Sequence, residues 1–221
     1  MGNSTGKITL VIADDAPATR AGIRAMAEKA GDIEVVGEAQ DGFEVQKLVK
    51  DLCPQVLTLD LKMPGPFKSS VELQMWLHEN CPGTAVLPYT GHGRDALLAQ
   101  LKEAGAAGYV EKSASPETLI GKIRLAAAGV THFDPEQEET AERWNEEVGK
   151  KWKSLSKREH LIALWITTPA TNRGIAQELN LSERTVESHV RNVLTKLDMK
   201  TRQEAALWIL KHFPEEVGGA W

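Results

Sequence analysis

Residues 56–65 read VLTLDLKMPG, an apolar run that ends on a carboxylate, Asp60, and then turns through Met63-Pro64-Gly65. A short apolar run without polar alternation is typical of a strand that is buried on both faces. A charged group at the end of such a strand is costly unless water solvates it or a ligand uses it. Asp60 is therefore either a solvated loop aspartate or a reactive or metal-binding carboxylate, and the rest of the chain has to distinguish the two.

The first 130 residues repeat one plan, in which a short apolar run precedes a helical pattern. Expected strands are 8–13, 33–37, 56–59, 85–89 and 107–110, and expected helices are 18–29, 43–52, 71–79, 96–103 and 117–128. Apolar strands that alternate with helices form a parallel sheet covered on both faces. Residues 1–130 are therefore predicted to form an α/β doubly wound domain with a five-stranded parallel sheet, in which Pro88 predicts a bulge in the fourth strand.

Polar side chains follow four of these runs. Asp14 and Asp15 follow the first run, and Asp60 follows the third. Thr90 follows the fourth, and Lys112 comes shortly after the fifth. The carboxyl ends of parallel strands meet at one edge of an open sheet, where ligands bind. We therefore expect these five side chains to share one site rather than to be five unrelated loop residues.

The residue types at this edge suggest phosphoryl chemistry. Three crowded carboxylates repel one another unless a hard cation neutralises them, and Mg²⁺ prefers oxygen ligands. A carboxylate beside such an ion can attack phosphorus and form an aspartyl phosphate, and charge stabilisation then carries most of the rate. We predict that Asp60 accepts the phosphoryl group and that Asp14 and Asp15 hold the metal. Lys112 and the Thr90 hydroxyl would contact the phosphoryl oxygens.

The segments IADD, LTLDLKMPG, YTG and GYVEK occur in this order, and residues 7–129 resemble the receiver domain of bacterial two-component response regulators. The resemblance implies a flavodoxin-like fold and a sensor histidine kinase as phosphodonor. It implies direct Mg²⁺ ligation by Asp15, ligation by Asp14 chiefly through water, and a further ligand from the Lys62 backbone carbonyl. It also implies that Tyr109 swings inward when Thr90 engages the phosphoryl group. Self-phosphorylation and slow autodephosphorylation would be the only catalysis.

The sequence departs from the receiver pattern after Asp60. The loop from Pro64 to Glu72 is two residues longer than usual, and residues 65–70 lack the customary later glycine. The site residues themselves are unaffected. The conformation of the loop beside Asp60 is therefore left open.

Residues 131–153 form an acidic connector, with 4 Lys/Arg against 7 Asp/Glu. Ala141, Trp144, Val148 and Trp152 are spaced as one stripe of a helix. Such a stripe usually packs on a neighbouring domain, which is the interpretation we favour. The alternative is a helix that mediates dimerisation or carries the signal.

Residues 154–213 carry 9 Lys/Arg against 6 Asp/Glu and read as helical throughout. Ser156 begins a capping box, Ser182 is placed to cap a helix over 183–197, and Thr201 begins a last helix through His212. This spacing predicts a small all-α helix-turn-helix domain, followed by a tail over 214–221. The segments LSKRE and NRGIAQELNLSERTVESHVRNVLTKL resemble the LuxR-type DNA-binding domain of the NarL/FixJ class.

The second helix of this motif fits the major groove of DNA. Phosphate contacts are expected from three basic side chains, Arg173, Arg184 and Lys196. Base contacts are expected from Glu187, Ser188 and Arg191, with Thr185 and Asn192 on the same outward surface. The alternative for Glu187 is an ion pair with Arg184 or Arg191. The resemblance implies that the last helix pairs two DNA-binding domains through Ala205, Trp208 and Ile209.

Several classes of site are disfavoured by composition. No stretch approaches the ~18 apolar residues of a membrane span, so we expect no membrane partner. Cys53 and Cys81 lack metal-type spacing and are expected to be reduced core thiols of a cytoplasmic protein. The resemblance to response regulators implies that this cytoplasm is bacterial. His189 has no partner His or Cys at metal spacing and is expected to pack rather than to bind a metal.

Taken together, these patterns predict a DNA-binding transcriptional regulator controlled by phosphorylation. Activation would form a homodimer that binds two half-sites of double-stranded DNA. The main alternative is a regulator that works without phosphorylation and is controlled by its linker helix or by a protein partner. A phosphatase of the haloacid-dehalogenase type is disfavoured because it needs a second aspartate where Lys62 stands. A pure protein-binding module is disfavoured by the basic helix-turn-helix.

Overall fold

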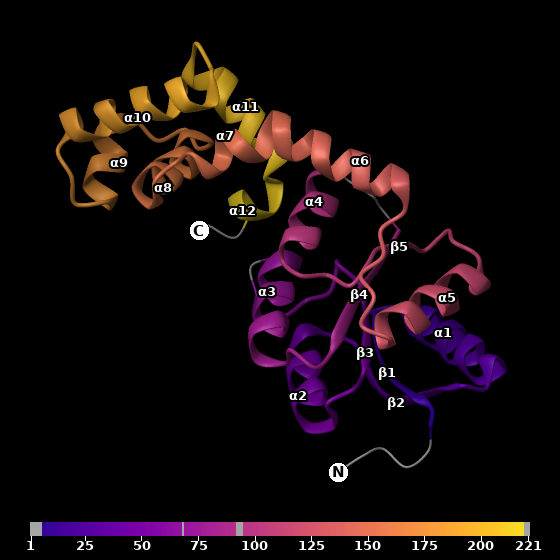
Figure 1. Cartoon of the computed structure of the whole chain (residues 1–221). Helices are drawn as coiled ribbons and strands as arrows, with labels where there is room; N and C mark the ends of the chain where they lie inside the picture. Colours follow the sequence, from indigo (N-terminus) through magenta and orange to yellow (C-terminus); the bar gives the residue numbers. More distant parts are fainter. Residues whose placement is uncertain (1–5, 68, 92–94, 219–221) are drawn as a thin grey trace. The chain divides into compact units, whose positions relative to one another are not determined.

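The computed structural model describes residues 6–67, 69–91 and 95–218 (Figure 1). The chain divides into two compact units, the N-terminal unit Met1–Ala141 and the C-terminal unit Glu142–Trp221. Among the helices described, none has the length and apolar character needed to cross a membrane.

The N-terminal unit is built on five parallel strands in the order β2-β1-β3-β4-β5. Their bounds are β1 Ile8–Ala13, β2 Ile33–Ala39, β3 Val56–Leu59, β4 Ala85–Thr90 and β5 Val110–Glu111. The winding direction reverses between β1 and β3, which is where ligands bind in such sheets. The predicted doubly wound, five-stranded parallel sheet is confirmed, although β5 is shorter than expected and Gly108 forms only an isolated bridge to His132.

Five helices cover the sheet on its two faces (Figure 1). They are α1 Pro17–Ala30, α2 Gly42–Leu52, α3 Ser70–Asn80, α4 Asp95–Glu103 and α5 Pro116–Ala127. Apolar side chains of α1 and α5 pack with one face of the strands, and those of α2 and α3 pack with the other. This arrangement explains why the strands show no polar alternation, because both of their faces are buried.

The bulge predicted at Pro88 is absent from the ladder between β3 and β4, where Leu59 pairs with Pro88 in unbroken register. The carbonyl groups of Val86 and Thr90 accept hydrogen bonds from Ala107 and Lys112, on the β5 side. Because alternate residues of a strand face the same neighbour, the missing N–H of Pro88 also falls on that side. β5 on that side is only two residues long, so the hydrogen bond that Pro88 cannot donate is a small loss to the sheet.

The expectation of core cysteines is wrong for Cys53. Both thiols are free, but Cys53 is exposed and Cys81 is only half-buried. Cys53 would continue the buried stripe of Val45 and Val49 at a spacing of four residues, but its left-handed conformation with φ 44° ends α2 there.

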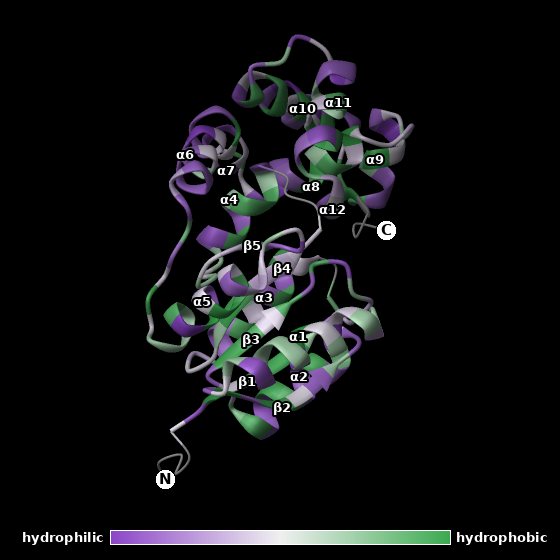
Figure 2. Ribbon diagram, turned by 90° about the vertical axis from the view of Figure 1, so that its right-hand side faces the viewer, coloured by the Kyte–Doolittle hydropathy of each residue, from purple (hydrophilic) through white to green (hydrophobic). Residues whose placement is uncertain are grey.

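The connector is helical through most of its length, as predicted. It comprises α6 Pro135–Trp144, a π-helical turn η1 Asn145–Gly149 and α7 Lys150–Lys153. Ala141, Trp144, Val148 and Trp152 are all buried, so the packing of this stripe is confirmed. The rest of α6 is hydrophilic (Figure 2).

The start of the connector, up to Ala141, belongs to the N-terminal unit and is bonded to its helices. The Nζ atom of Lys122, which is nearly fully buried, lies 2.9 Å from Asp134 Oδ2 and donates to the Tyr109 carbonyl at 3.2 Å. Lys102 of α4 forms an ion pair with Glu138 of α6. These contacts fix the first turn of α6 beside Tyr109.

The C-terminal unit contains α8 Lys157–Ile166, α9 Asn172–Glu178, α10 Glu183–Leu197, α11 Arg202–His212 and α12 Pro214–Gly218. Ser156 and Thr201 form capping boxes, and Ser182 caps α10. The turn before α10 contains Asn180 at φ 52°, a conformation that asparagine tolerates well. The all-α helix-turn-helix prediction is confirmed. Apolar and polar residues share α10 (Figure 2), and its valines point to the core.

Candidate functional site

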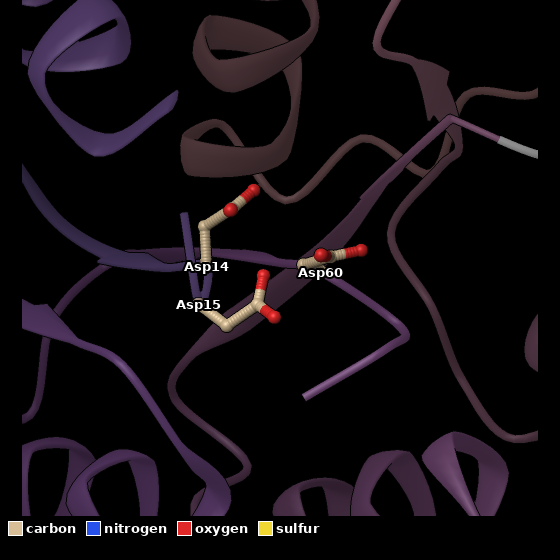
Figure 3. Close-up of side chains that lie close together, drawn as sticks. All are labelled: Asp14, Asp15 and Asp60. Carbon is tan, nitrogen blue, oxygen red and sulfur yellow. The ribbon is translucent and has the colours of Figure 1, made fainter. Parts of the chain in front are cut away.

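Two backbone hydrogen bonds hold the acidic residues together at the carboxyl ends of β1 and β3. The N–H of Asp60 donates to the Ala13 carbonyl at 2.8 Å, and the N–H of Asp14 donates to the Ala39 carbonyl at 3.0 Å. Carboxylate oxygens of Asp14, Asp15 and Asp60 thereby lie within 4.8 Å of one another (Figure 3). Asp14 and Asp60 are buried, whereas Asp15 is exposed. The structure thus brings together the three carboxylates that the strand ends predicted.

Lys112 completes the charged cluster. Its backbone N–H donates to the Thr90 carbonyl at 2.8 Å, which ties the end of β4 to the segment after β5. Its Nζ atom lies 2.7 Å from Asp14 Oδ2 and 2.9 Å from Asp60 Oδ2. Burial opposes the charged form of Lys112, but the two carboxylates outweigh it, and the pKa of Lys112 lies above its ordinary value. Lys112 is therefore a fixed positive charge beside both aspartates.

The donors at this site fit a hard divalent cation. The three carboxylates offer only oxygen atoms, and one ammonium leaves them with excess negative charge. Mg²⁺ favours oxygen ligands of this kind and keeps several of its waters. Asp15 is exposed, so water can reach the cation from that side. The residues present can thus hold Mg²⁺.

Thr90 and Tyr109, predicted as switch residues, are both buried with 2% exposure. Thr90 is the last residue of β4 and pairs with Glu111 of β5. Burial raises the pKa of Tyr109 to about 12, so its phenol is neutral at physiological pH. Tyr109 can therefore respond to the site through packing and hydrogen bonding, not through charge.

The lengthened loop after Asp60 is held against α2. The N–H of Gly42 donates to the Pro64 carbonyl at 2.8 Å, and a Cβ added at Gly65 would come within 3.0 Å of the Gly42 Cα. The Lys62 N–H lies 3.4 Å from Asp60 Oδ1. Lys68 lies outside the described residues, and Ser69 caps α3. The extra loop length thus leaves the backbone next to Asp60 anchored.

One residue at the site escaped prediction from sequence. Arg20 of α1 donates to the backbone carbonyls of Asp14 at 2.7 Å and Asp15 at 3.3 Å. Its position, one turn into the helix that follows the acidic strand end, is the signal that could have identified it.

The surface predicted to bind DNA is largely open in the C-terminal unit. Seven of the predicted DNA contacts are exposed on α9 and α10: Arg173, Arg184, Glu187, Ser188, Arg191, Asn192 and Lys196. Thr185 is half-buried, and its hydroxyl lies 2.7 Å from Ser182 Oγ at the start of α10. Within the described residues, Glu187 forms no ion pair with Arg184 or Arg191, so it remains available to a base. His189 is half-buried, as a packing residue should be.

Lys196 has a different environment from the other basic residues. Its Nζ atom donates to Glu159 Oε2 at 2.7 Å and to the Ser154 carbonyl at 2.8 Å. Burial by itself would raise the pKa of Glu159, but hydrogen bonds from Lys196 and Ser156 outweigh it and lower the pKa to about 2. This pair favours a structural role for Lys196 over the predicted phosphate contact.

Two of the predicted dimer contacts need correction. Ala205 and Ile209 have 0% exposure because they pack inside their own unit, so they cannot offer surface to a second copy. Trp208 is half-buried against Trp152 and Phe213. The apolar residues that α11 does expose are Leu207 at 69% and Leu210 at 42%.

Comparison with known proteins agrees with this geometry. Residues 10–124 match the family described as response regulator receiver domain, and residues 153–209 match the bacterial regulatory proteins of the luxR family. The oxygen regulatory protein NreC of Staphylococcus haemolyticus is 34% identical over 91% of this chain and 96% of its own length. The nitrate/nitrite response regulator protein NarL of Escherichia coli K12 is 31% identical over 91% and 94%.

Solved structures support the same fold. The response regulator ChrA of a heme-sensing two-component system is 30% identical, with a TM-score of 0.52 over 92% of this chain and 96% of that one. The response regulator RcsB of Salmonella typhimurium is 23% identical, with a TM-score of 0.64 over 92% and 99%, and it supports the fold alone.

Proposed function

Because this chain belongs to the NarL/FixJ-class response regulators, phosphorylation-controlled transcription regulators with a receiver and a LuxR-type DNA-binding domain, we propose that phosphorylation of Asp60 switches its DNA binding. The observation that carries the proposal is the cluster of Asp14, Asp15 and Asp60, with Lys112 bridging Asp14 and Asp60. A sensor histidine kinase is the proposed phosphodonor. The proposed location is the bacterial cytoplasm, where both the kinase and DNA are reached.

Phosphoryl transfer would begin with attack of an Asp60 carboxylate oxygen on phosphorus. The bond from phosphorus to the donor atom breaks as the new P–O bond forms, and the donor leaves with the electron pair. Mg²⁺, when bound, would neutralise charge on the phosphoryl oxygens. We assign its ligation to Asp14, Asp15, Asp60 and the Lys62 backbone carbonyl. Lys112, already beside Asp60, would pair with a phosphoryl oxygen and stabilise the charged transition state.

Thr90 and Tyr109 would carry the change away from Asp60. The Thr90 hydroxyl would donate to a phosphoryl oxygen, and Tyr109 would repack behind it. The Lys122 ammonium, which donates to the Tyr109 carbonyl and pairs with Asp134, supports a route from this segment to the start of α6. The chain itself would catalyse only self-phosphorylation and autodephosphorylation.

On the C-terminal unit we propose a helix in the major groove. Arg173 and Arg184 would contact phosphates, and Glu187, Ser188 and Arg191 would contact base edges, with Thr185 and Asn192 beside them. Lys196 is the weakest of the proposed contacts, since it is bonded to Glu159. A homodimer formed on activation would bind two half-sites, and we assign its contacts to Trp208 with the exposed Leu207 and Leu210.

Intact-mass analysis of the full chain tests the proposal. With Mg²⁺ and a small phosphodonor such as acetyl phosphate, we expect one phosphoryl adduct, which should not form when the metal is chelated before the phosphodonor is added. The treated protein should then bind promoter DNA more tightly than the untreated protein. A well-folded chain that gains no adduct would contradict the proposal.

Substitution on α10 separates base contacts from phosphate contacts. Arg191→Ala is expected to weaken binding to the preferred site by about 2 kcal/mol and to relax sequence preference, since a bidentate contact to guanine is lost. Arg184→Ala should weaken binding to all sequences alike and make it less salt-dependent. Fluorescence anisotropy with matched and scrambled duplexes at several salt concentrations measures both. Equal behaviour of the two variants would argue against this assignment.

A second candidate, control by the linker without phosphorylation, rests on the anchoring of α6. Asp134 and Glu138 pair with Lys122 and Lys102 on the N-terminal unit. If no adduct forms, Asp134→Asn should still change the DNA affinity of the full chain under this candidate.

A further inference from the structure

We propose that Arg20 is a positioning residue for the metal site, fixing the backbone that presents Asp14 and Asp15 to Mg²⁺. The inference rests on the proposed function and assigns it one more residue. Arg20, on α1, links β2 to the turn that carries the two aspartates. Its guanidinium donates to the backbone carbonyls of both aspartates and to the Glu38 carboxylate on β2, and we call this link the brace.

Arg20 holds the carbonyl side of the acidic turn. Its Nη1 atom donates to the Asp14 carbonyl at 2.7 Å and to the Asp15 carbonyl at 3.3 Å. Its Nε atom donates to Glu38 Oε2 at 3.3 Å, and its side chain is only 15% exposed. Glu38 belongs to β2, directly before Ala39, whose carbonyl accepts the Asp14 N–H. The brace therefore joins the turn to a rigid strand.

Among the described residues, Arg20 is the side chain that binds the backbone carbonyls of this turn, whereas the Asp14 N–H is held separately by the Ala39 carbonyl. Ala16, the residue before α1, has no side-chain cap for the helix. The Asp14 carboxylate substitutes for one, because its Oδ1 atom accepts the Ala16 N–H at 2.9 Å, and its Oδ2 atom faces Lys112. With both oxygens of Asp14 engaged, the orientation of the turn depends on bonds to its backbone, which Ala39 supplies on the N–H side and Arg20 on the carbonyl side.

Two effects of Arg20 on the cation oppose each other. Its positive charge repels Mg²⁺, and the Glu38 carboxylate, which Arg20 shares with Arg24, offsets only part of that charge. Its hydrogen bonds hold the ligands in place, and loss of such supporting bonds typically weakens metal binding 10- to 100-fold. Since the repulsion is partly offset and the hydrogen bonds are not replaced, we expect positioning to dominate.

Arg24 provides a matched control on the same helix. It lies 2.5 Å from Glu38 Oε1, so it shares the acidic partner of Arg20. Among the described residues, the Arg24 guanidinium bonds to Glu38 and not to Asp14 or Asp15. Replacing either arginine removes one positive charge and one ion pair with Glu38. Only Arg20→Ala also removes the hydrogen bonds to the aspartate carbonyls.

Isothermal titration of the unphosphorylated full chain with Mg²⁺ tests the inference. Arg20→Ala should bind Mg²⁺ about tenfold more weakly than wild type, and Arg24→Ala should stay within about twofold. In the phosphorylation assay, Arg20→Ala should need about tenfold more Mg²⁺ for half-maximal rate and recover the wild-type rate at saturation. Should Arg20→Ala fail to fold, Arg20→Lys against Arg24→Lys carries the same comparison, because one ammonium cannot replace the planar fork.

The outcomes are distinguishable. Mg²⁺ affinity of Arg20→Ala equal to or tighter than wild type, or an equal loss in Arg24→Ala, would overturn the positioning role and leave the proposed function intact. Wild-type protein that binds no Mg²⁺ would overturn both, and wild-type protein that binds Mg²⁺ but gains no adduct would overturn the proposed function alone.

Discussion

Replacing Asp60 with Asn is expected to abolish the phosphoryl adduct and the gain in DNA affinity that follows it. The amide has the shape of the carboxylate but is a far weaker nucleophile, and it also removes one ligand charge from the site. Lys112, which lies between Asp14 and Asp60, would then pair with Asp14 alone. Intact-mass spectra and DNA titrations of wild type and Asp60→Asn, each with Mg²⁺ and acetyl phosphate, measure the two losses.

Asp32→Asn is the matched control, since Asp32 forms an exposed ion pair with Arg124 and belongs to no part of the acidic cluster. It makes the same chemical change and should keep the wild-type adduct. Asp15→Asn should form the adduct only at raised Mg²⁺. An undiminished adduct on Asp60→Asn would assign the acceptor to another residue.

Replacing Lys196 with Met is expected to destabilise the C-terminal unit by about 2 kcal/mol. The change leaves the Glu159 carboxylate, 5% exposed, without its charged partner, and an unpaired buried charge is strongly destabilising. The partial exposure of Lys196, 37%, reduces the cost below that of a fully buried pair. Tryptophan fluorescence during urea unfolding of the full chain measures it, because five of the six tryptophans lie in residues 142–221.

The pKa of Glu159 determines how the stability loss in Lys196→Met changes with pH. The pKa of Glu159 is about 2 in the folded chain against an ordinary value of 4.5. A depressed carboxyl pKa contributes stability that is present above pH 4.5 and is lost as the pH falls toward about 2. The difference between wild type and Lys196→Met should therefore be largest above pH 4.5 and shrink on acidification.

Two further variants separate a structural role of Lys196 from a role at DNA. Glu159→Gln combined with Lys196→Met should recover part of the stability, since no charge is left buried. Lys200→Met, which removes an exposed lysine from the same unit, should leave stability unchanged. If Lys196→Met weakens DNA binding while its stability matches wild type, Lys196 acts as a phosphate contact after all.

Much of the architecture could be predicted because its signals are local. Ser156, Ser182 and Thr201 all cap the helices predicted for them, since a cap involves only residues within one turn. The acidic cluster was predictable for a different reason. Parallel strands bring their carboxyl ends to one edge, and because β1 and β3 are adjacent in the sheet, the residues that follow Ala13 and Leu59 are neighbours.

Other features depended on contacts between distant residues. Ala205 and Ile209 are apolar residues of the last helix and were predicted to contact a second copy. The sequence could not tell that the C-terminal unit itself covers them and leaves Leu207 and Leu210 exposed. A lysine on the outward face of α10 looked available for DNA, yet Glu159, 37 residues away, holds it. Arg20 looked like an ordinary helix residue until the fold placed Asp14, Asp15 and Glu38 around it.

The sequence by itself therefore determined which segments are helices and strands, that the strands form a parallel sheet, and which carboxylates meet at the end of the sheet. Those properties follow from periodicity, from capping within a turn and from the geometry of parallel strands. Only the tertiary structure decided the partners of Arg20, Lys196 and the apolar face of α11. Long side chains have several rotamers of similar energy, and the partner that each one reaches is chosen by neighbours that the fold brings near.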